Sequence, residues 1–221
     1  MVKLISVYKK FDDLEVLNNF CISFKESKIT CLFGPSGVGK TTIANITANL
    51  IPVDGGKVTG LEKAVYSYVF QEPRLLRWYS VYENIDFVLK NVYDDKKRVT
   101  IINNYIDLVE LRGYENYRPD ALSGGMCQRV SLARAFAYPS NFLILDEPFK
   151  GLDLKLKNEM VALFKKLWIE SKRTVLFITH DADEAVTLSD YIYVIDNRPV
   201  EIIKKINVSN KDDAKKILLS I

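Results

Sequence analysis

The sequence predicts an α/β fold in which a mostly parallel sheet is flanked by helices. From residue 142 onward, short apolar runs alternate with helical segments, the pattern of parallel strands joined by crossover helices. Earlier in the chain, the apolar run Ile29–Phe33 ends in a glycine-rich turn, and a helix is expected to begin at Lys40. A chain of 221 residues is long enough to bury one sizeable core, so we expect a single domain over residues 1–221.

The expected elements follow the chain in order. Strands are expected in the opening third at Val2–Tyr8, Phe20–Phe24 and Ile29–Phe33. A helix from Lys40 to about Leu50 is broken by Pro52 and the cluster Asp54, Gly55, Gly56. The middle region has one strand and then three helices, at Ala64–Phe70, Val81–Tyr93, Thr100–Leu111 and Ser123–Tyr138. The last third alternates strand and helix over Phe142–Leu145, Leu154–Glu170, Thr174–Thr179, Ala182–Leu188 and Tyr191–Ile195. A closing strand at Pro199–Ile206 and a short terminal helix at Asp212–Leu219, capped by Asp212 or Asn210, are expected to follow. The middle region is thus expected to be a helical insert over about residues 72–138.

Composition excludes several classes of protein. Lys and Arg exceed Asp and Glu by only three, 31 against 28, so the charge does not favour a nucleic acid as partner. The cysteines Cys21, Cys31 and Cys127 are scattered, which argues against disulfides or zinc and suggests three small buried side chains. Apolar runs such as Phe142–Leu145 are far shorter than the roughly 18 to 20 residues of a membrane span, and the start does not resemble a secretory signal. We therefore expect a cytoplasmic location.

A phosphate-binding loop is predicted between the strand at Ile29–Phe33 and the helix at Lys40. The segment fits the pattern GxxxxGK[ST] with Gly34, Pro35, Ser36, Gly37, Val38, Gly39, Lys40 and Thr41. In such a loop backbone amides surround the phosphates, Lys40 contacts the β and γ oxygens, and Thr41 holds Mg²⁺. The positive end of the helix dipole also points at the anion. A chance match is expected in roughly 1% of chains of this size, and the strand-loop-helix placement makes it rarer.

Two carboxylates end the apolar strand at Phe142–Leu145. Asp146 is expected to bind Mg²⁺ through water, and Glu147 to activate the attacking water. Taken alone, the pair followed by Pro148 could be a simple exit from a strand into a turn. The phosphate loop elsewhere in the chain favours the catalytic interpretation.

A second anion site is predicted at the start of the helix near Ser123. The segment consists of Leu122, Ser123, Gly124, Gly125, Met126, Cys127, Gln128 and Arg129. Ser123 stands at the cap position, and two glycines would leave the backbone amides uncovered. An ordinary Ser-capped helix explains the cap, but it does not explain two glycines in the first turn, where each costs about 1 kcal/mol of helix propensity.

Together these segments resemble the ATP-binding cassette (ABC) family, whose signature LSGGQ is written LSGGM here. The likeness covers nearly the whole chain and implies a P-loop NTPase fold with an antiparallel β subdomain at one edge, a helical insert, and ATP with Mg²⁺ as ligands. It implies roles for further residues: Phe11 stacking on adenine, Thr42 in the nucleotide site, Gln71 as the Q-loop residue near Mg²⁺, Gly151, Leu152 and Asp153 as the D-loop, and His180 as the γ-phosphate sensor. Phe11 could instead be a core aromatic, with Tyr8 as its competitor, Gln71 a solvated turn residue, and His180 a structural histidine.

The resemblance also implies a function. Family members pair head to tail, so that Ser123, Gly125 and their neighbours face the ATP of the partner, and we expect a homodimer beneath a separate transmembrane permease, indirectly served by a solute-binding protein. Segments Phe70–Leu76 and Leu145–Phe149 resemble bacterial importers of the nitrate, sulfonate and taurine type, whereas Arg77, Cys127 and Lys150 depart from them.

This resemblance places the chain on the inner face of the cell membrane. Trp78 and Tyr79 are expected to be exposed for the permease, unless both pack inside the insert. The alternative is a soluble ABC ATPase in a non-transport process. A DNA-repair member would need a long heptad insert between Thr42 and Ala121, and none fits there.

Overall fold

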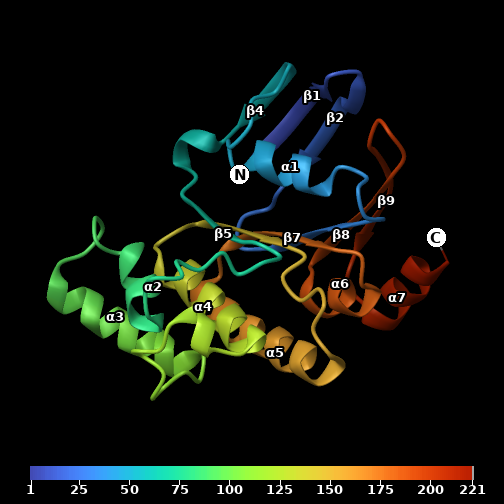
Figure 1. The fold of residues 1–221 in the computed structure, drawn as a ribbon. Coiled ribbons are helices and arrows are strands. Elements are labelled where there is room, and N and C mark those ends of the chain that lie inside the picture. The colour runs from blue at the N-terminus through green and yellow to red at the C-terminus, as the bar shows by residue number, and fades with distance from the viewer. Residues whose placement is uncertain (221) are drawn as a thin grey trace. The chain divides into compact units, whose positions relative to one another are not determined.

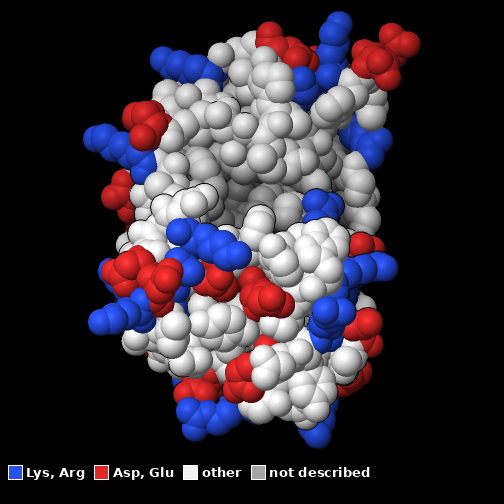
Figure 2. Space-filling view, turned by 60° about the vertical axis from the view of Figure 1, so that its left-hand side comes forward, with Lys and Arg blue, Asp and Glu red and all other residues white. Residues whose placement is uncertain are grey.

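The computed structural model describes residues 1–220, which form two compact units (Figure 1). Unit 1 comprises residues 1–66, 141–147 and 172 onward, and unit 2 comprises residues 67–140 and 148–171. Among the residues described, no helix has both the length and the apolar character needed to cross a membrane. On the face drawn in Figure 2, acidic and basic side chains are interspersed, as expected for a net charge of +3.

Unit 1 is built on two sheets. The antiparallel sheet has the order β2 (Leu14–Ser23), β1 (Lys3–Phe11), β4 (Gly55–Thr59). In the larger sheet the parallel strands follow the order β6 (Phe142–Asp146), β7 (Thr174–Thr179), β3 (Ile29–Phe33), β8 (Tyr191–Asp196), and β9 (Glu201–Asn207) pairs antiparallel with β8. The predicted α/β class, with a mostly parallel sheet and an antiparallel sheet, is confirmed.

The central strands of the larger sheet are apolar because both of their faces are covered. Every residue of β7 is buried, and β3 and β6 are buried up to their last residue. Helix α1 (Lys40–Thr47) packs on β6 and β7, α6 (Ala182–Leu188) on β3 and β7, and α7 (Lys211–Leu219) on α6. The register pairs Asp146 with Ile178 and Phe33 with Thr179, so the residues that follow these three strands meet at one edge.

Unit 2 is mostly helical. Strand β5 (Tyr66–Val69) leads into it, and its helices are α2 (Val81–Phe87), α3 (Asp95–Leu108), α4 (Gly124–Ala137) and α5 (Leu154–Ser171). Helix α4 packs against each of the other three. Helix α2 starts with a capping box, in which Ser80 accepts from the Glu83 amide and Glu83 accepts from the Ser80 amide.

Strand β4 was not predicted, because Gly55 and Gly56 were interpreted only as helix breakers. The structure gives these glycines another reason. Gly56 has φ +79°, and a Cβ placed on it would lie 2.0 Å from the carbonyl oxygen of Ser6 in β1. Glycine is therefore required by the close approach of two strands.

Some element boundaries and one burial prediction were wrong. Helix α3 starts at Asp95 instead of Thr100, because Asp94 caps it and its first turn is polar, which hides the apolar period. Strand β2 begins at Leu14, well before the expected Phe20. Cys21 is exposed and Cys127 partly buried, so only Cys31 is the buried side chain expected of all three.

Candidate nucleotide-binding site

The loop between β3 and α1 is shaped by neighbours that leave no room for side chains. A Cβ on Gly34 would lie 2.2 Å from the carbonyl oxygen of Ile195 in β8. Gly39 caps α1 with φ +128°, and a Cβ there would lie 2.7 Å from Val200 and 2.9 Å from Val16. Two glycines of the motif are thus fixed by packing as well as by the need to expose amides.

Lys40 is turned into this loop. Its side chain is 4% exposed, and its Nζ donates to the carbonyl oxygens of Gly34 and Pro35, both at 2.8 Å. The same Nζ lies 3.6 Å from Glu147 Oε1. The ammonium group is therefore already held where the loop would enclose a phosphate, and a charge-assisted bond to phosphate would be stronger than these neutral contacts.

Thr41 and Asp146 provide the oxygens expected for a divalent cation. Thr41 Oγ1 donates to Asp146 Oδ2 at 2.9 Å, so a hydroxyl and a carboxylate from segments distant in sequence lie side by side. Among residues 1–220, no three His, Cys, Asp or Glu side chains are grouped to hold a metal ion. The hydroxyl of Thr41 and the carboxylate of Asp146 are oxygen ligands of the kind that Mg²⁺ takes, with phosphates and water completing its shell.

Glu147 is the centre of the site. It is 8% exposed, and its amide donates to the Ile178 carbonyl at 3.0 Å. Its Oε1 lies 3.5 Å from Nδ1 of the half-exposed His180, besides its contact with Lys40. Its backbone has φ +47°, a left-handed conformation that costs a non-glycine residue on the order of 1 kcal/mol or more and is found at functional sites.

The backbone around His180 is fixed by a short polar network. Thr179 Oγ1 donates to Glu184 Oε2 at 2.6 Å and accepts from the Asp181 amide at 3.0 Å. Asp181 in turn caps α6 by accepting from the amides of Asp183 and Glu184. The histidine is therefore held between a buried strand and a capped helix, with its ring on the side of Glu147.

Phe11 lies at the end of β1 and is 45% exposed, which excludes the alternative that it is a core aromatic. Tyr8, its competitor, has its ring against Gly55, where an added Cβ would lie 3.2 Å away. Lys9 Nζ lies 5.3 Å from the centre of the Phe11 ring. Phe11 is thus an accessible aromatic face in unit 1.

The signature segment of unit 2 differs from its prediction at Gly125. Ser123 caps α4, and its Oγ accepts from the Met126 amide at 3.2 Å. A Cβ on Gly124 would meet nothing within 4 Å, but a Cβ on Gly125 would lie 2.8 Å from Leu156 in α5. Only Gly124 is open as expected, and Gly125 is needed for helix packing.

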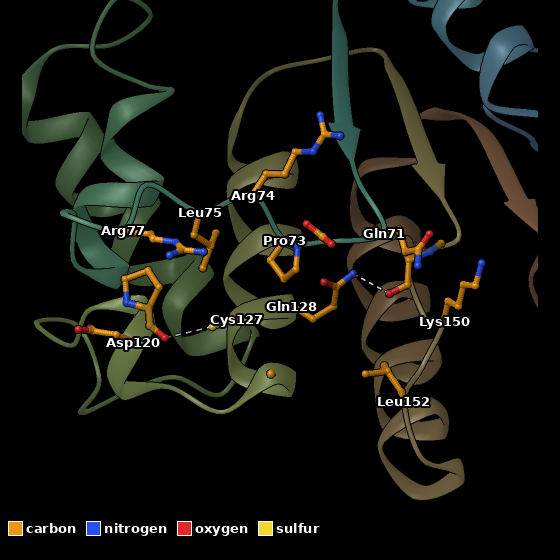
Figure 3. Close-up of a pocket in the computed structure, with 14 residues that line it drawn as sticks. Gln71, Pro73, Arg74, Leu75, Arg77, Asp120, Cys127, Gln128, Lys150 and Leu152 are labelled. Atoms are coloured by element: carbon orange, nitrogen blue, oxygen red, sulfur yellow. Dashed lines mark hydrogen bonds between the residues drawn. The ribbon is translucent and has the colours of Figure 1, made fainter.

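Gln128 also departs from the prediction that it faces the ATP of the partner. It is 3% exposed, and its Nε2 donates to the Pro148 carbonyl at 2.6 Å (Figure 3). Asp153 of the expected D-loop caps α5, since its Oδ1 accepts from the Leu156 amide at 3.0 Å. Both residues have clear structural partners in unit 2.

Gln71 is exposed and lines a pocket of about 800 Å³ within unit 2 (Figure 3). The pocket lies among the segment after β5, the start of α4 and the segment that follows Glu147, with Glu72, Arg77, Asp120, Gly124, Cys127, Lys150 and Leu152 in its wall. Burial raises the pKa of the Cys127 thiol, whose Sγ lies 3.5 Å from the Pro119 carbonyl oxygen.

Of the two expected surface aromatics, only Trp78 is exposed. Trp78 is 66% exposed, whereas Tyr79 is half-buried between Trp78 and Phe87, with ring centres 6.2 Å and 6.0 Å apart. The expected exposure is therefore found for Trp78 and not for Tyr79.

Three side chains with a place near the site were missed in the sequence. Arg198 donates to the Gly37 carbonyl, Glu184 supports the His180 segment, and Arg134 donates to the carbonyl oxygens of Pro73 and Arg74. Arg198 and Arg134 act on backbone far away in sequence, and a sequence pattern carries no signal for such contacts. Glu184 accepts from the side chain of Thr179, five positions before it.

Comparison with known proteins identifies the family to which a chain with this site belongs. Residues 17–150 match the family described as ABC transporter, which is more than half of the chain. The chain belongs to the ABC transporter family. It is 38% identical over 207 residues to the aliphatic sulfonates import ATP-binding protein SsuB 1 of Shouchella clausii, covering 94% of this chain and 82% of that protein.

Two further ABC proteins extend the comparison. The spermidine/putrescine import ATP-binding protein PotA of Clostridium novyi is 36% identical over 212 residues, covering 91% of this chain and 61% of that protein. The solved dimeric structure of the ATP-binding cassette MJ0796 in a post-hydrolysis state, bound to ADP and Pi, superposes with a TM-score of 0.82 at 28% identity, covering 95% and 100% of the two chains. The chain is an ATP-binding, ATP-hydrolysing subunit of an ABC transporter.

Proposed function

We propose that this chain powers the import of a solute through a separate transmembrane permease. The observation that carries the proposal is the convergence of Lys40, Glu147 and His180 beside the Thr41–Asp146 pair. The relatives named for import support the direction of transport. A sulfonate relative and a polyamine relative match at the same 36% identity, which suggests that cargo is selected by the permease.

In the proposed reaction the γ-phosphate of ATP is transferred to water. The loop amides and Lys40 hold the β and γ oxygens, and Phe11 stacks on the adenine. Glu147 accepts a proton from the water that attacks phosphorus, the bond to the ADP oxygen breaks, and His180 orients the γ-phosphate. Mg²⁺, held by Thr41 and Asp146, would neutralise phosphate charge.

We further propose that two copies of the chain form the working unit. In this homodimer Ser123, Gly124, Gly125 and Met126 of one copy bind the γ-phosphate of ATP held by the phosphate loop of the other, with Asp153 near the junction. The dimeric state of the cassette MJ0796 supports the pairing of two copies. Hydrolysis removes the bridging phosphate and with it the differential stability of the closed dimer.

The dimer would lie on the inner face of the membrane, against the permease, with a solute-binding protein acting through the permease. The exposed Trp78 is our candidate for the permease contact, because aromatic side chains are enriched in interface cores. Its neighbours Tyr79 and Phe87 extend the aromatic surface. We propose that the two compact units work together as one ATPase domain.

The assigned base is tested by Glu147→Gln. This variant is expected to bind ATP with the affinity of the wild type and to lose about 10²- to 10⁴-fold in turnover, since it removes general base catalysis. Glu62→Gln, an exposed residue of the same unit, is the matched control. Turnover near that of the wild type in Glu147→Gln would refute the assignment.

The transport role is tested by capturing the tagged protein from detergent-solubilised membranes and identifying what accompanies it by mass spectrometry. A multi-span membrane protein is expected, and Trp78→Ser should reduce its recovery. Ile169→Ser, at another exposed apolar side chain of unit 2, should not. Recovery of only soluble or nucleic-acid partners would contradict the proposal and favour the soluble ATPase alternative.

A further inference from the structure

Helix α4 carries two side chains that hold backbone one to three positions after a proposed catalytic residue. The first is Gln128, whose Nε2 donates to the carbonyl oxygen of Pro148 at 2.6 Å (Figure 3). Pro148 follows Glu147 directly in the chain, and the next residue, Phe149, is fully buried. A buried carbonyl that loses its donor costs about 1–3 kcal/mol, so this bond fixes the path of the chain as it leaves Glu147.

The second is Arg134, which reaches the segment that carries Gln71. Its Nη2 donates to the Pro73 carbonyl at 3.0 Å and its Nη1 to the Arg74 carbonyl at 3.1 Å. Desolvation lowers the pKa of Arg134 from its ordinary value, and the guanidinium still remains a cation at neutral pH. Its planar fork therefore matches two successive carbonyl oxygens, which a single-point ammonium cannot match in the same way.

The segment that carries Gln71 is also held by stacked side chains of its own. The guanidinium of Arg74 lies 3.9 Å above the ring of Phe70, and that ring stacks on Tyr68 with centres 4.1 Å apart. Arg74 has φ +46°, a left-handed conformation that needs support from its surroundings. Gln71 thus lies in a bend between Phe70 and Arg74, whose side chains stack on each other. The carbonyls of Pro73 and Arg74 at the end of this segment are held by α4.

We propose that Gln128 and Arg134 are positioning residues that connect the signature end of α4 to Glu147 and Gln71. The two donors are six positions apart on one helix, about 9 Å along its axis, and a packed helix of this length moves as one body. When the start of α4 engages the ATP of a partner, the helix is displaced. Gln128 and Arg134 then transmit this displacement to the backbone that follows Glu147 and Gln71. The inference rests on the proposed roles of Gln71, Glu147 and the signature segment.

The test compares Gln128→Met and Arg134→Gln with the wild type in the full chain. Both variants are expected to keep single-chain ATP affinity within about two-fold, because neither residue belongs to the phosphate loop. Both should lower kcat by about 10- to 100-fold, the effect expected of a small misplacement of catalytic groups. In a Glu147→Gln background, ATP-dependent dimer formation should persist, which shows that the signature still binds.

Controls separate this effect from loss of fold. Arg112→Gln removes an exposed arginine of the same unit that pairs only locally, with Asp107, and should leave kcat unchanged. If Arg134→Gln is unstable, Arg134→Lys carries the test, since it keeps the charge and loses the fork; it should recover part of the lost rate. A kcat within two-fold of the wild type in folded Gln128→Met and Arg134→Lys overturns the inference, as does a kcat loss that only follows the folded fraction.

The same experiments distinguish this inference from the proposed function. If Glu147→Gln hydrolyses ATP at the normal rate, the assignment of the catalytic residues fails first. If Glu147→Gln is inactive while the α4 variants have normal kcat, only the positioning role of Gln128 and Arg134 fails.

Discussion

The two helix starts that we propose to bind phosphate, those of α1 and α4, are built differently. Helix α1 begins directly with Lys40, a cation that is buried in its own loop and in contact with Glu147. Helix α4 begins after Ser123 with uncharged residues only, two of them glycine. Both helix starts offer backbone amides and the positive end of a dipole, but only α1 adds a full charge.

This difference indicates which of the two helix starts, that of α1 or that of α4, can bind a nucleotide without the other. A helix start with its own cation, hydroxyl and carboxylates can hold a nucleotide by itself. A helix start with amides alone contributes too little to hold a free anion in water, because each dipole contact is worth only about 0.3–1 kcal/mol at an exposed position. We therefore propose that the start of α4 completes a site in which the phosphate is already held by another copy of the chain, as in the proposed dimer.

The largest expected effect comes from removing the cation of α1. Lys40→Met should weaken single-chain ATP binding by about 10- to 100-fold, because a hydrogen bond to a charged group is worth about 1.5–3 kcal/mol. Calorimetric titration with ATP and with ADP measures it. Ser123→Ala, at the uncharged start of α4, is the matched variant and should leave this affinity unchanged. Equal losses in the two variants would contradict the distinction drawn between the helices.

The second prediction concerns Gly125, the glycine of α4 that packs against Leu156 in α5. Gly125→Ala should lower the free energy of unfolding by about 1–3 kcal/mol, because its Cβ would lie 2.8 Å from Leu156. Leu156→Ala in the same chain should recover part of that loss, and denaturant unfolding of the single and double variants measures the coupling. Strictly additive losses would show that the two side chains do not compete for space.

The phosphate loop and the carboxylate pair could be predicted from sequence because each lies within one short segment. The spacing from Gly34 to Thr41 and the order of the Phe142–Asp146 strand are local patterns with a physical reason, and the sheet register then brings their ends together. Strands β3 and β7 were predicted with their observed bounds, since buried parallel strands are continuous apolar runs.

What could not be predicted depends on contacts between distant segments. Nothing local distinguishes Gly124 from Gly125, and only the position of Leu156 in α5 gives them different roles. The same holds for Gln128 and Arg134, whose partners are backbone carbonyls 20 and 60 or more positions away. Strand β4 was missed because its glycines are explained only by β1 beside it.

A smaller effect is expected at Asp153, which tests whether the proposed D-loop residue has more than a structural role. Asp153→Ala should cost about 0.5–2 kcal/mol of stability through loss of the α5 cap, and Asp153→Ser should restore most of it. Thermal unfolding measures the cap, and ATP turnover is measured on the same samples. A purely structural residue would give Asp153→Ser the turnover of the wild type, whereas a role at the dimer junction would leave it slow.

The smallest change in stability is expected at Gly124, and it isolates the open glycine of α4. Gly124→Ala should change the free energy of unfolding by less than about 1 kcal/mol, in the stabilising direction, because alanine favours the helix and its Cβ meets no neighbour within 4 Å. Single-chain ATP affinity should also be unchanged.

Dimer formation with ATP in a Glu147→Gln background should decrease in the Gly124→Ala variant, since the new methyl group would stand where the γ-phosphate of the partner approaches the amides. Size-exclusion chromatography with ATP measures it, and a dimer as abundant as that of Glu147→Gln alone would remove Gly124 from the shared site. The contrast with Gly125→Ala then separates the two adjacent glycines, one required by the neighbouring helix and the other by the ligand.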